Sequence, residues 1–188
     1  INIYEACFIS RLIDEYKHQI KDSKKNIAVL EIGLARGTST IMILNKIVNT
    51  KYKIKYDVVD MNQTQQWKND GMNNIKEFMK DKIKKIKLVL HQDSSTIILP
   101  TLTSNYDVIF IDGSHDKRIV IQDFINSDKL LKKGGLMIID DVLHIGVKKS
   151  LLEFYNKDKY SIVHVTKTGF GISKKLYDVA REKKSFSN

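Results

Sequence analysis

Short runs of β-branched and apolar residues alternate along this sequence with longer segments in which apolar residues recur at helical spacing. The runs predict about seven strands, at residues 27–32, 55–60, 86–91, 106–112, 135–140, 160–166 and 169–174. The intervening periodicity predicts helices at residues 9–20, 39–48, 122–131 and 148–155. Strands that alternate with helices are typical of an α/β fold, a mostly parallel sheet with helices on both faces.

The end of the chain departs from this alternation. Thr168 and Gly169 supply a short turn between the last two runs, which predicts an antiparallel final strand. The length of 188 residues suits a single domain spanning 1–188. Because the sequence begins at Ile1 rather than at a methionine, excision from a longer polypeptide is expected.

Composition narrows the setting of the protein. No apolar stretch is long enough to cross a bilayer, so we expect no membrane partner. Cys7 is the one cysteine, which excludes an intramolecular disulfide and favours an intracellular, cytoplasmic location. No catalytic partner for its thiol is identifiable, and we predict that Cys7 is buried.

The formal net charge of +10 could attract a nucleic acid. The excess is almost all lysine, spread through segments such as 80–87 that alternate with isoleucine and would make a solvated face. Nucleic-acid binding is therefore possible but not favoured.

The segment VLEIGLARGTST, residues 29–40, runs from a buried strand through a glycine turn into a helix. Gly33 and Gly37 allow a sharp turn against a ligand, and the helix start at Thr38 and Ser39 offers free N–H groups to an anion. The dinucleotide pattern G-x-G-x-x-G and the phosphate-loop ending Gly-Lys-Ser/Thr are both absent. A bound anionic group, either a carboxylate or a phosphate, is expected here. The missing patterns make NAD or ATP less favoured as the ligand.

Two further acids follow the next strands. Asp60 closes YDVVD and can accept both hydroxyls of a ribose. Asp93, followed by Ser94, closes LVLHQD and can accept a hydrogen bond from an adenine amino group. With the glycine turn, these residues predict an adenosine site.

These segments resemble the class I S-adenosylmethionine-dependent methyltransferases, especially the catechol and macrolide-sugar O-methyltransferases. The likeness covers nearly the whole chain, in VLEIGLARGTST, YDVVD, HQDSS, YDVIFIDGSHD, LLKKGGLMIIDDV and GFGIS. It implies a Rossmann-like fold with S-adenosylmethionine as cofactor, whose methionine part lies against residues 33–37 while Glu31 helps to fix the turn. The sequence departs from the pattern at Ala35, where many members have glycine.

Three acids follow the fourth and fifth predicted strands. Asp112, Asp140 and Asp141 would repel one another unless a cation neutralised them, and oxygen ligands favour Mg²⁺. The resemblance supports a metal site, because metal-dependent members carry an acid on the fourth strand and a paired Asp-Asp or Asp-Asn about 28 positions later, and here 140 − 112 = 28. Alternatively, Asp112 faces the methyl-transfer site while the Asp pair caps the following segment.

A hydroxyl acceptor must lose its proton as it attacks the methyl group. His115, three residues after Asp112, is the candidate base. Weaker candidates are His144 in the acceptor pocket and Trp67, which could stack on a ligand or pack on a helix; Asp123 is expected to be structural.

The sequence therefore predicts a metal-assisted O-methyltransferase that acts on a sugar or another small hydroxylated molecule. Two alternatives stay open at this point. One is an RNA or cap ribose methyltransferase, and the other is a non-catalytic methyltransferase-like module of a larger protein.

Overall fold

The computed structural model describes residues 7, 9–14, 16, 26–49, 52–80, 85–165 and 171–175. Residues 7, 9–14 and 16 are helical. The strands are β1 (Asn26–Ile32), β2 (Lys53–Val59), β3 (Ile86–His91), β4 (Tyr106–Ile111), β5 (Leu131–Ile139), β6 (Tyr160–Val165) and β7 (Gly171–Lys175). The helices are α2 (Thr38–Ile47), α3 (Asp70–Met79), α4 (Ser95–Ile98), the 3₁₀ turn η2 (Leu99–Thr101), α5 (Lys117–Leu130) and α6 (Ile145–Phe154).

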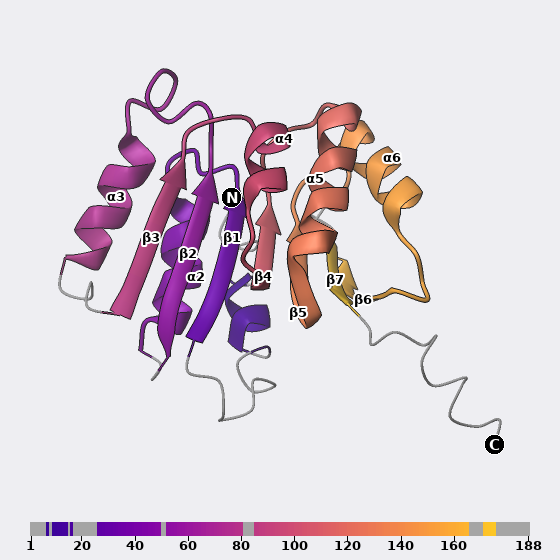
Figure 1. The fold of residues 1–188 in the computed structure, drawn as a ribbon, viewed down its shortest axis with the longest axis horizontal. Coiled ribbons are helices and arrows are strands. Elements are labelled where there is room, and N and C mark those ends of the chain that lie inside the picture. Colours follow the sequence, from indigo (N-terminus) through magenta and orange to yellow (C-terminus); the bar gives the residue numbers. More distant parts are fainter. Residues whose placement is uncertain are drawn as a thin grey trace.

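Within the described residues the strands form one seven-stranded sheet in the order β3-β2-β1-β4-β5-β7-β6 (Figure 1). The neighbours from β3 to β5 are parallel, whereas β7 is antiparallel to both β5 and β6. The structure thus confirms the predicted α/β class, the mostly parallel sheet and the antiparallel last strand. The predicted turn at Thr168 and Gly169 lies outside the described residues.

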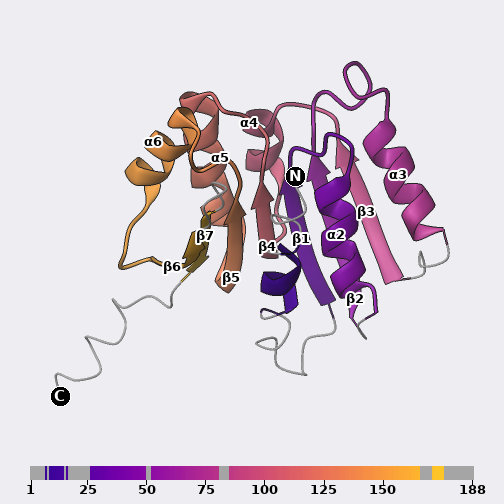
Figure 2. The same cartoon turned by 180° about the vertical axis from the view of Figure 1, so that it is seen from behind.

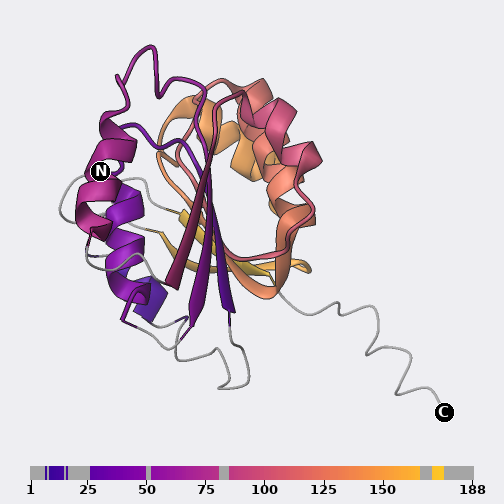
Figure 3. The same cartoon turned by 60° about the vertical axis from the view of Figure 1, so that its left-hand side comes forward.

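Helices cover both faces of the sheet, which Figure 3 shows nearly edge-on. The leading helical residues, α2 and α3 lie on the face that is nearer in Figure 2, and α4, α5 and α6 lie on the opposite face. Because successive strand residues point to opposite faces, β1 sends Val29 into the first layer and Leu30 into the second, and both are fully buried. The sheet therefore holds two hydrophobic cores.

Several element boundaries differ from the prediction. The helix α3 was not predicted, and α5 begins at Lys117 rather than at residue 122, because the Asp116 carboxylate accepts a hydrogen bond from the backbone N of Arg118. The strand β5 begins at Leu131, so Gly134 and Gly135 lie within it and do not stop the preceding helix.

Two further expectations concern the surface of the protein. Cys7 is exposed, so the prediction that its thiol is buried was wrong. In the described part of the chain, no helix has the length and apolar character needed to span a membrane.

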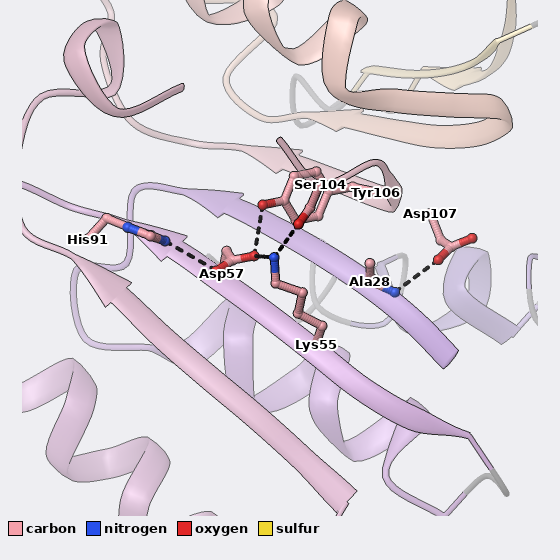
Figure 4. A network of polar contacts seen from close by, with 7 residues as sticks. All are labelled: Ala28, Lys55, Asp57, His91, Ser104, Tyr106 and Asp107. Atoms are coloured by element: carbon pink, nitrogen blue, oxygen red, sulfur yellow. Dashed lines mark hydrogen bonds and ion pairs between the residues drawn. The ribbon is translucent and has the colours of Figure 1, made fainter. Parts of the chain in front are cut away.

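A polar network lies within the sheet on the side of α4 and α5, and Figure 4 draws it. Asp57 Oδ2, on β2, accepts a hydrogen bond from the Tyr106 hydroxyl at 2.8 Å. The same oxygen forms an ion pair with Lys55 Nζ at 2.9 Å. His91 Nε2 lies 3.2 Å from the other oxygen of Asp57. Burial opposes the charge on Asp57, but hydrogen bonds from Lys55, Tyr106 and His91 outweigh it and lower the pKa of the carboxyl. The network therefore braces the strand that leads to Asp60.

Candidate functional site

The ends of the five parallel strands β1 to β5 are held at one edge of the sheet by four backbone hydrogen bonds that continue just beyond the strands. The bonds run from Asp60 N to His91 O (3.1 Å), Gly33 N to Val59 O (2.9 Å), Asp112 N to Ile32 O (2.8 Å) and Asp140 N to Ile111 O (3.0 Å). Since parallel strands present their carboxyl ends together, the candidate acids converge on this edge.

Gly33 allows the turn after β1 to lie directly against the end of β4. Its φ is +90°, and a Cβ there would stand 2.1 Å from the carbonyl oxygen of Asp112. Any side chain would separate the two strand ends, so this position needs glycine. Ala35 in the same turn has a φ of +46°, in the left-handed region, and so keeps the turn at the position where many members of the family that the sequence resembles have glycine.

Glu31 holds the start of α2, just after the turn, from within the core. It is fully buried, and its carboxylate accepts hydrogen bonds from the Ser39 hydroxyl, from Thr40 Oγ1 at 2.6 Å and from the Tyr56 hydroxyl at 2.6 Å. Burial raises the pKa of Glu31 from 4.5 to about 7, although the three hydroxyls oppose the rise. Glu31 thus ties the start of α2 to β2, and its role in fixing the turn stays a prediction from the resemblance.

A pocket of about 390 Å³ opens at this edge. Of the residues predicted to bind the cofactor, six line it, namely Gly33, Ala35, Asp60, Asp93, Ser94 and Asp112. Four others, Glu31, Gly37, Thr38 and Ser39, are not among its lining residues and instead build the turn and the start of α2. The glycine turn, the ends of β2 and β3 and the end of β4 therefore share one hollow.

Asp60 uses most of its hydrogen-bonding capacity within the protein. Its Oδ2 accepts from the backbone N of Leu34 and of Ala35, both at 2.9 Å, and from Gln63 Nε2 at 3.1 Å. Its Oδ1 accepts from Asn62 N at 2.7 Å. A carboxylate has about four acceptor positions, so Asp60 first holds the glycine turn in place and keeps little capacity for a ligand.

Asp112 joins the main pocket to a smaller hollow that is also lined by His115, Asp140 and Asp141. Burial, and then the charges of Asp140, Asp141 and Glu31, raise the pKa of Asp112 to about 8. The three strand-end acids therefore lie close enough to affect one another, as the sequence predicted.

His115 pairs with one of these acids. Its Nε2 lies 2.7 Å from Asp141 Oδ2, and its ring stacks on His144 with centroids 4.3 Å apart. Asp141 has a φ of +54°, and its backbone N donates to Asp140 Oδ1 at 2.9 Å. An imidazole held by a carboxylate is suited to proton transfer.

The predicted metal ligands do not form a ready ligand cluster. Among the residues that the structure describes, no group of three or more histidine, cysteine, aspartate or glutamate side chains is arranged to hold a metal ion. Instead, the Asp141 carboxylate contacts His115, and Asp140 Oδ1 accepts from the backbone.

The structure also places the weaker candidates. Asp123 lies on the inner side of α5, where burial raises the pKa of its carboxyl to about 6, and it does not line the pocket. Trp67 does line the pocket, together with Met61, Asn62 and Gln66. These three polar or flexible neighbours were missed because the loop after β2 carries no periodicity or motif. The one available signal was a tryptophan in an otherwise polar stretch.

A family model described as a methyltransferase domain matches residues 30–142. The matched stretch contains the glycine turn and every strand-end acid of the site, from Glu31 to Asp141. The chain belongs to this methyltransferase family. The resemblance seen in the sequence is thereby confirmed.

Known proteins similar to this methyltransferase fall into two groups. An uncharacterised protein, R132, of Acanthamoeba polyphaga mimivirus is 29% identical over 119 residues, which are 63% of this chain and 52% of that protein. The chain thus spans about half the length of this relative. Among solved structures, the O-methyltransferase TomG of Streptomyces achromogenes, in complex with S-adenosylmethionine, has a TM-score of 0.66 at 16% identity and covers 94% of this chain and 82% of its own. An O-methyltransferase from Bacillus cereus, in complex with S-adenosylhomocysteine, has a TM-score of 0.64 at 17% identity with the same two coverages. At these identities the solved structures establish the shared fold.

Proposed function

We propose that this methyltransferase binds S-adenosylmethionine in the 390 Å³ pocket and transfers its methyl group to a hydroxyl of a small molecule. The observation that carries the proposal is the position of Asp112, which lines both the pocket and the adjoining hollow of His115 and Asp141. The hollow has a volume of only about 10 Å³, so a whole acceptor would not fit in it. The methyl group of a donor in the pocket and the hydroxyl of an acceptor at the hollow would meet at this residue. The pocket volume lies within the range of small-molecule sites, about 300–1,000 Å³.

The donor is placed by the residues that line the pocket. Asp93 and Ser94 would hold its adenine, Asp60 its ribose, and Gly33 and Asp112 its methionine part, and all five residues line the pocket. This order follows the strand ends from β3 through β2 and β1 to β4, so the sulfonium reaches the side of the pocket where the acceptor hollow begins.

Transfer is an in-line displacement in which the acceptor oxygen attacks the methyl carbon. The new O–CH₃ bond forms as the S–CH₃ bond breaks, its electron pair stays on sulfur, and S-adenosylhomocysteine leaves. With Nε2–H donated to Asp141, the Nδ1 atom of His115 takes the hydroxyl proton, and Asp141 stabilises the imidazolium that forms. Much of the rate comes from holding the two reactants in line, because the sulfonium is already reactive.

A divalent cation at Asp112, Asp140 and Asp141 stays a prediction for this site. Its support is the chemistry of the donors, three neighbouring carboxylates that favour an ion such as Mg²⁺. The carboxylates are not gathered as ligands around one point, so the steps above use only the protein's own side chains. If bound, the cation would lower the pKa of the acceptor hydroxyl.

The test combines binding and turnover on the purified chain. Calorimetry with S-adenosylhomocysteine should give a saturable signal. Incubation with methyl-labelled S-adenosylmethionine and a panel of phenols, nucleotide sugars and a short RNA should place the label on a small hydroxylated acceptor. Absence of binding to either form of the donor would overturn the proposal, and label found on the RNA alone would replace the acceptor class.

Two variants and a chelator separate the roles. His115→Gln and Asp112→Asn should lose turnover by about a hundred-fold or more while they still bind S-adenosylhomocysteine. Full turnover in EDTA would remove the cation from the proposal and leave methyl transfer intact, whereas recovery on added Mg²⁺ would support it.

A further inference from the structure

The cofactor pocket is closed on one side by the loop of residues 61–69, here called the adenosine loop. Met61, Asn62, Gln66 and Trp67 of this loop line the pocket. Asp60, directly before it, spends Oδ2 on three donors and Oδ1 on a fourth. Asp60 therefore keeps little capacity to accept both ribose hydroxyls, which stays a prediction, and the adenosine loop is placed to contact the nucleoside beside it.

Gln63 ties the adenosine loop to the glycine turn. It is fully buried, although most of its loop neighbours are exposed. Its Nε2 donates to Ala35 O at 2.7 Å and to Asp60 Oδ2 at 3.1 Å, and its backbone carbonyl accepts from Asn69 N at 2.7 Å. Gln63 thus joins the turn and the acid after β2 through its side chain, and the far end of the loop through its backbone carbonyl.

The backbone around Trp67 is held in a tight and unusual conformation. Gln66 N and Trp67 N both donate to Asn62 O, at 2.9 and 3.1 Å. The next two residues, Lys68 and Asn69, have φ values of +49° and +63°. Neither is glycine, and consecutive left-handed residues persist only where surrounding contacts hold them. The chain reverses immediately after Trp67, which leaves this residue outside α3 and beside the pocket.

We propose that Trp67 stacks on the adenine ring of the methyl donor and that Gln63 is the positioning residue for the loop that carries it. This inference rests on the proposed function, because it assumes that S-adenosylmethionine occupies the pocket. Trp67 is half-buried in the pocket wall that also contains Asp93 and Ser94, the residues assigned to the adenine edge. A flat indole and a flat purine gain from stacking, whereas hydrogen bonds at the purine edge leave its faces unfilled.

The sequence itself supplies the probe for this inference. Trp67 is the sole tryptophan, so the tryptophan emission of the unaltered chain reports this one side chain. S-adenosylhomocysteine and 5′-methylthioadenosine should both quench the emission, because both contain adenine. Homocysteine and methionine, which lack it, should leave the emission unchanged. Binding of S-adenosylhomocysteine by calorimetry without any change in emission would overturn the stacking.

Variants of the loop test the same claim through affinity. Trp67→Ala should raise the calorimetric Kd for S-adenosylhomocysteine about ten-fold or more. Because phenylalanine keeps an aromatic ring, the Kd of Trp67→Phe should stay within about three-fold of that of the unaltered chain. The matched control is Gln65→Ala, an exposed position on the same loop that does not line the pocket, which should bind normally. An unchanged Kd in Trp67→Ala would refute the proposal.

The positioning role of Gln63 has its own readout. Gln63→Ala should shift the emission of unliganded Trp67 to longer wavelength and increase its quenching by acrylamide, as the indole becomes more exposed. The Kd for S-adenosylhomocysteine should rise in the same variant. Unchanged emission and affinity would remove Gln63 from the proposal.

Failure of the inference and failure of the proposed function are distinguishable. If the unaltered chain does not bind S-adenosylhomocysteine, the proposed function fails. If it binds and Trp67→Ala binds equally well, the function stands and only the stacking is wrong.

Discussion

Replacing Glu31 by glutamine should change how the stability of this protein depends on pH. The Glu31 carboxyl is fully buried and its pKa is raised from 4.5 to about 7. Between these two values the folded state binds a proton that the unfolded state releases. The stability contribution is therefore fully present below about pH 4.5 and is lost as the pH rises through about 7.

The size of this effect follows from the difference between the two pKa values. At about 1.36 kcal/mol per pKa unit, the rise from 4.5 to about 7 corresponds to a loss of about 3 kcal/mol in the free energy of unfolding. Glutamine does not titrate and can still accept a hydrogen bond from the hydroxyls of Ser39, Thr40 or Tyr56. The Glu31→Gln variant should therefore lack this part of the pH dependence.

The assay is urea unfolding, followed by circular dichroism, at several pH values from about 5 to about 8. It is done under conditions where unfolding is two-state. The other titrating groups are common to both proteins, so the difference between the two curves reports Glu31 together with its smaller effect on the pKa of Asp112. Glu77→Gln is the control, because that side chain is 78% exposed and should leave the curve unchanged. Parallel curves for the unaltered chain and Glu31→Gln would refute the reasoning.

Three other substitutions follow from contacts around the site. Gly146→Ala would put a Cβ 2.0 Å from the carbonyl oxygen of His115. Turnover should fall about a hundred-fold in steady-state assays, while calorimetry finds the Kd for S-adenosylhomocysteine nearly unchanged. Asp60→Asn replaces one carboxylate oxygen, which accepts hydrogen bonds from the glycine turn, by an NH₂ group that donates. The Kd for S-adenosylhomocysteine should rise about ten-fold, and an unchanged Kd in calorimetry would count against the anchoring role of Asp60. Asp57→Asn should cost about 1–3 kcal/mol in urea unfolding near neutral pH without affecting the cofactor. Because the pKa of Asp57 is lowered, this cost should diminish as acid protonates the carboxyl, and a constant cost would contradict the assignment.

The positions of the strands along the chain and the acids at their ends could be predicted from the sequence, because both depend on local pattern. A buried parallel strand is a short apolar run, and the residue that ends it lies at the carboxyl edge wherever the strand sits. Glu31, Asp60, Asp93 and Asp112 are therefore found where their runs end. Helix boundaries were less well predicted. The helix α3 has buried residues Gly71, Ile75 and Met79 at helical spacing, but its polar composition hid them.

Only the tertiary structure decided which partners the polar side chains have. Asp57 reads as one more strand residue, yet its charge is held by Tyr106, which lies 49 positions away. Asp60 reads as a ribose ligand, yet its carboxylate is largely taken by the turn that β1 brings beside it. The pairing of His115 with Asp141 spans 26 positions and depends on β4 and β5 being neighbours. Hydrophobic periodicity reports whether a residue is buried, because burial follows from a repeating face. A hydrogen bond needs a particular atom at a particular distance, and chain folding alone supplies it.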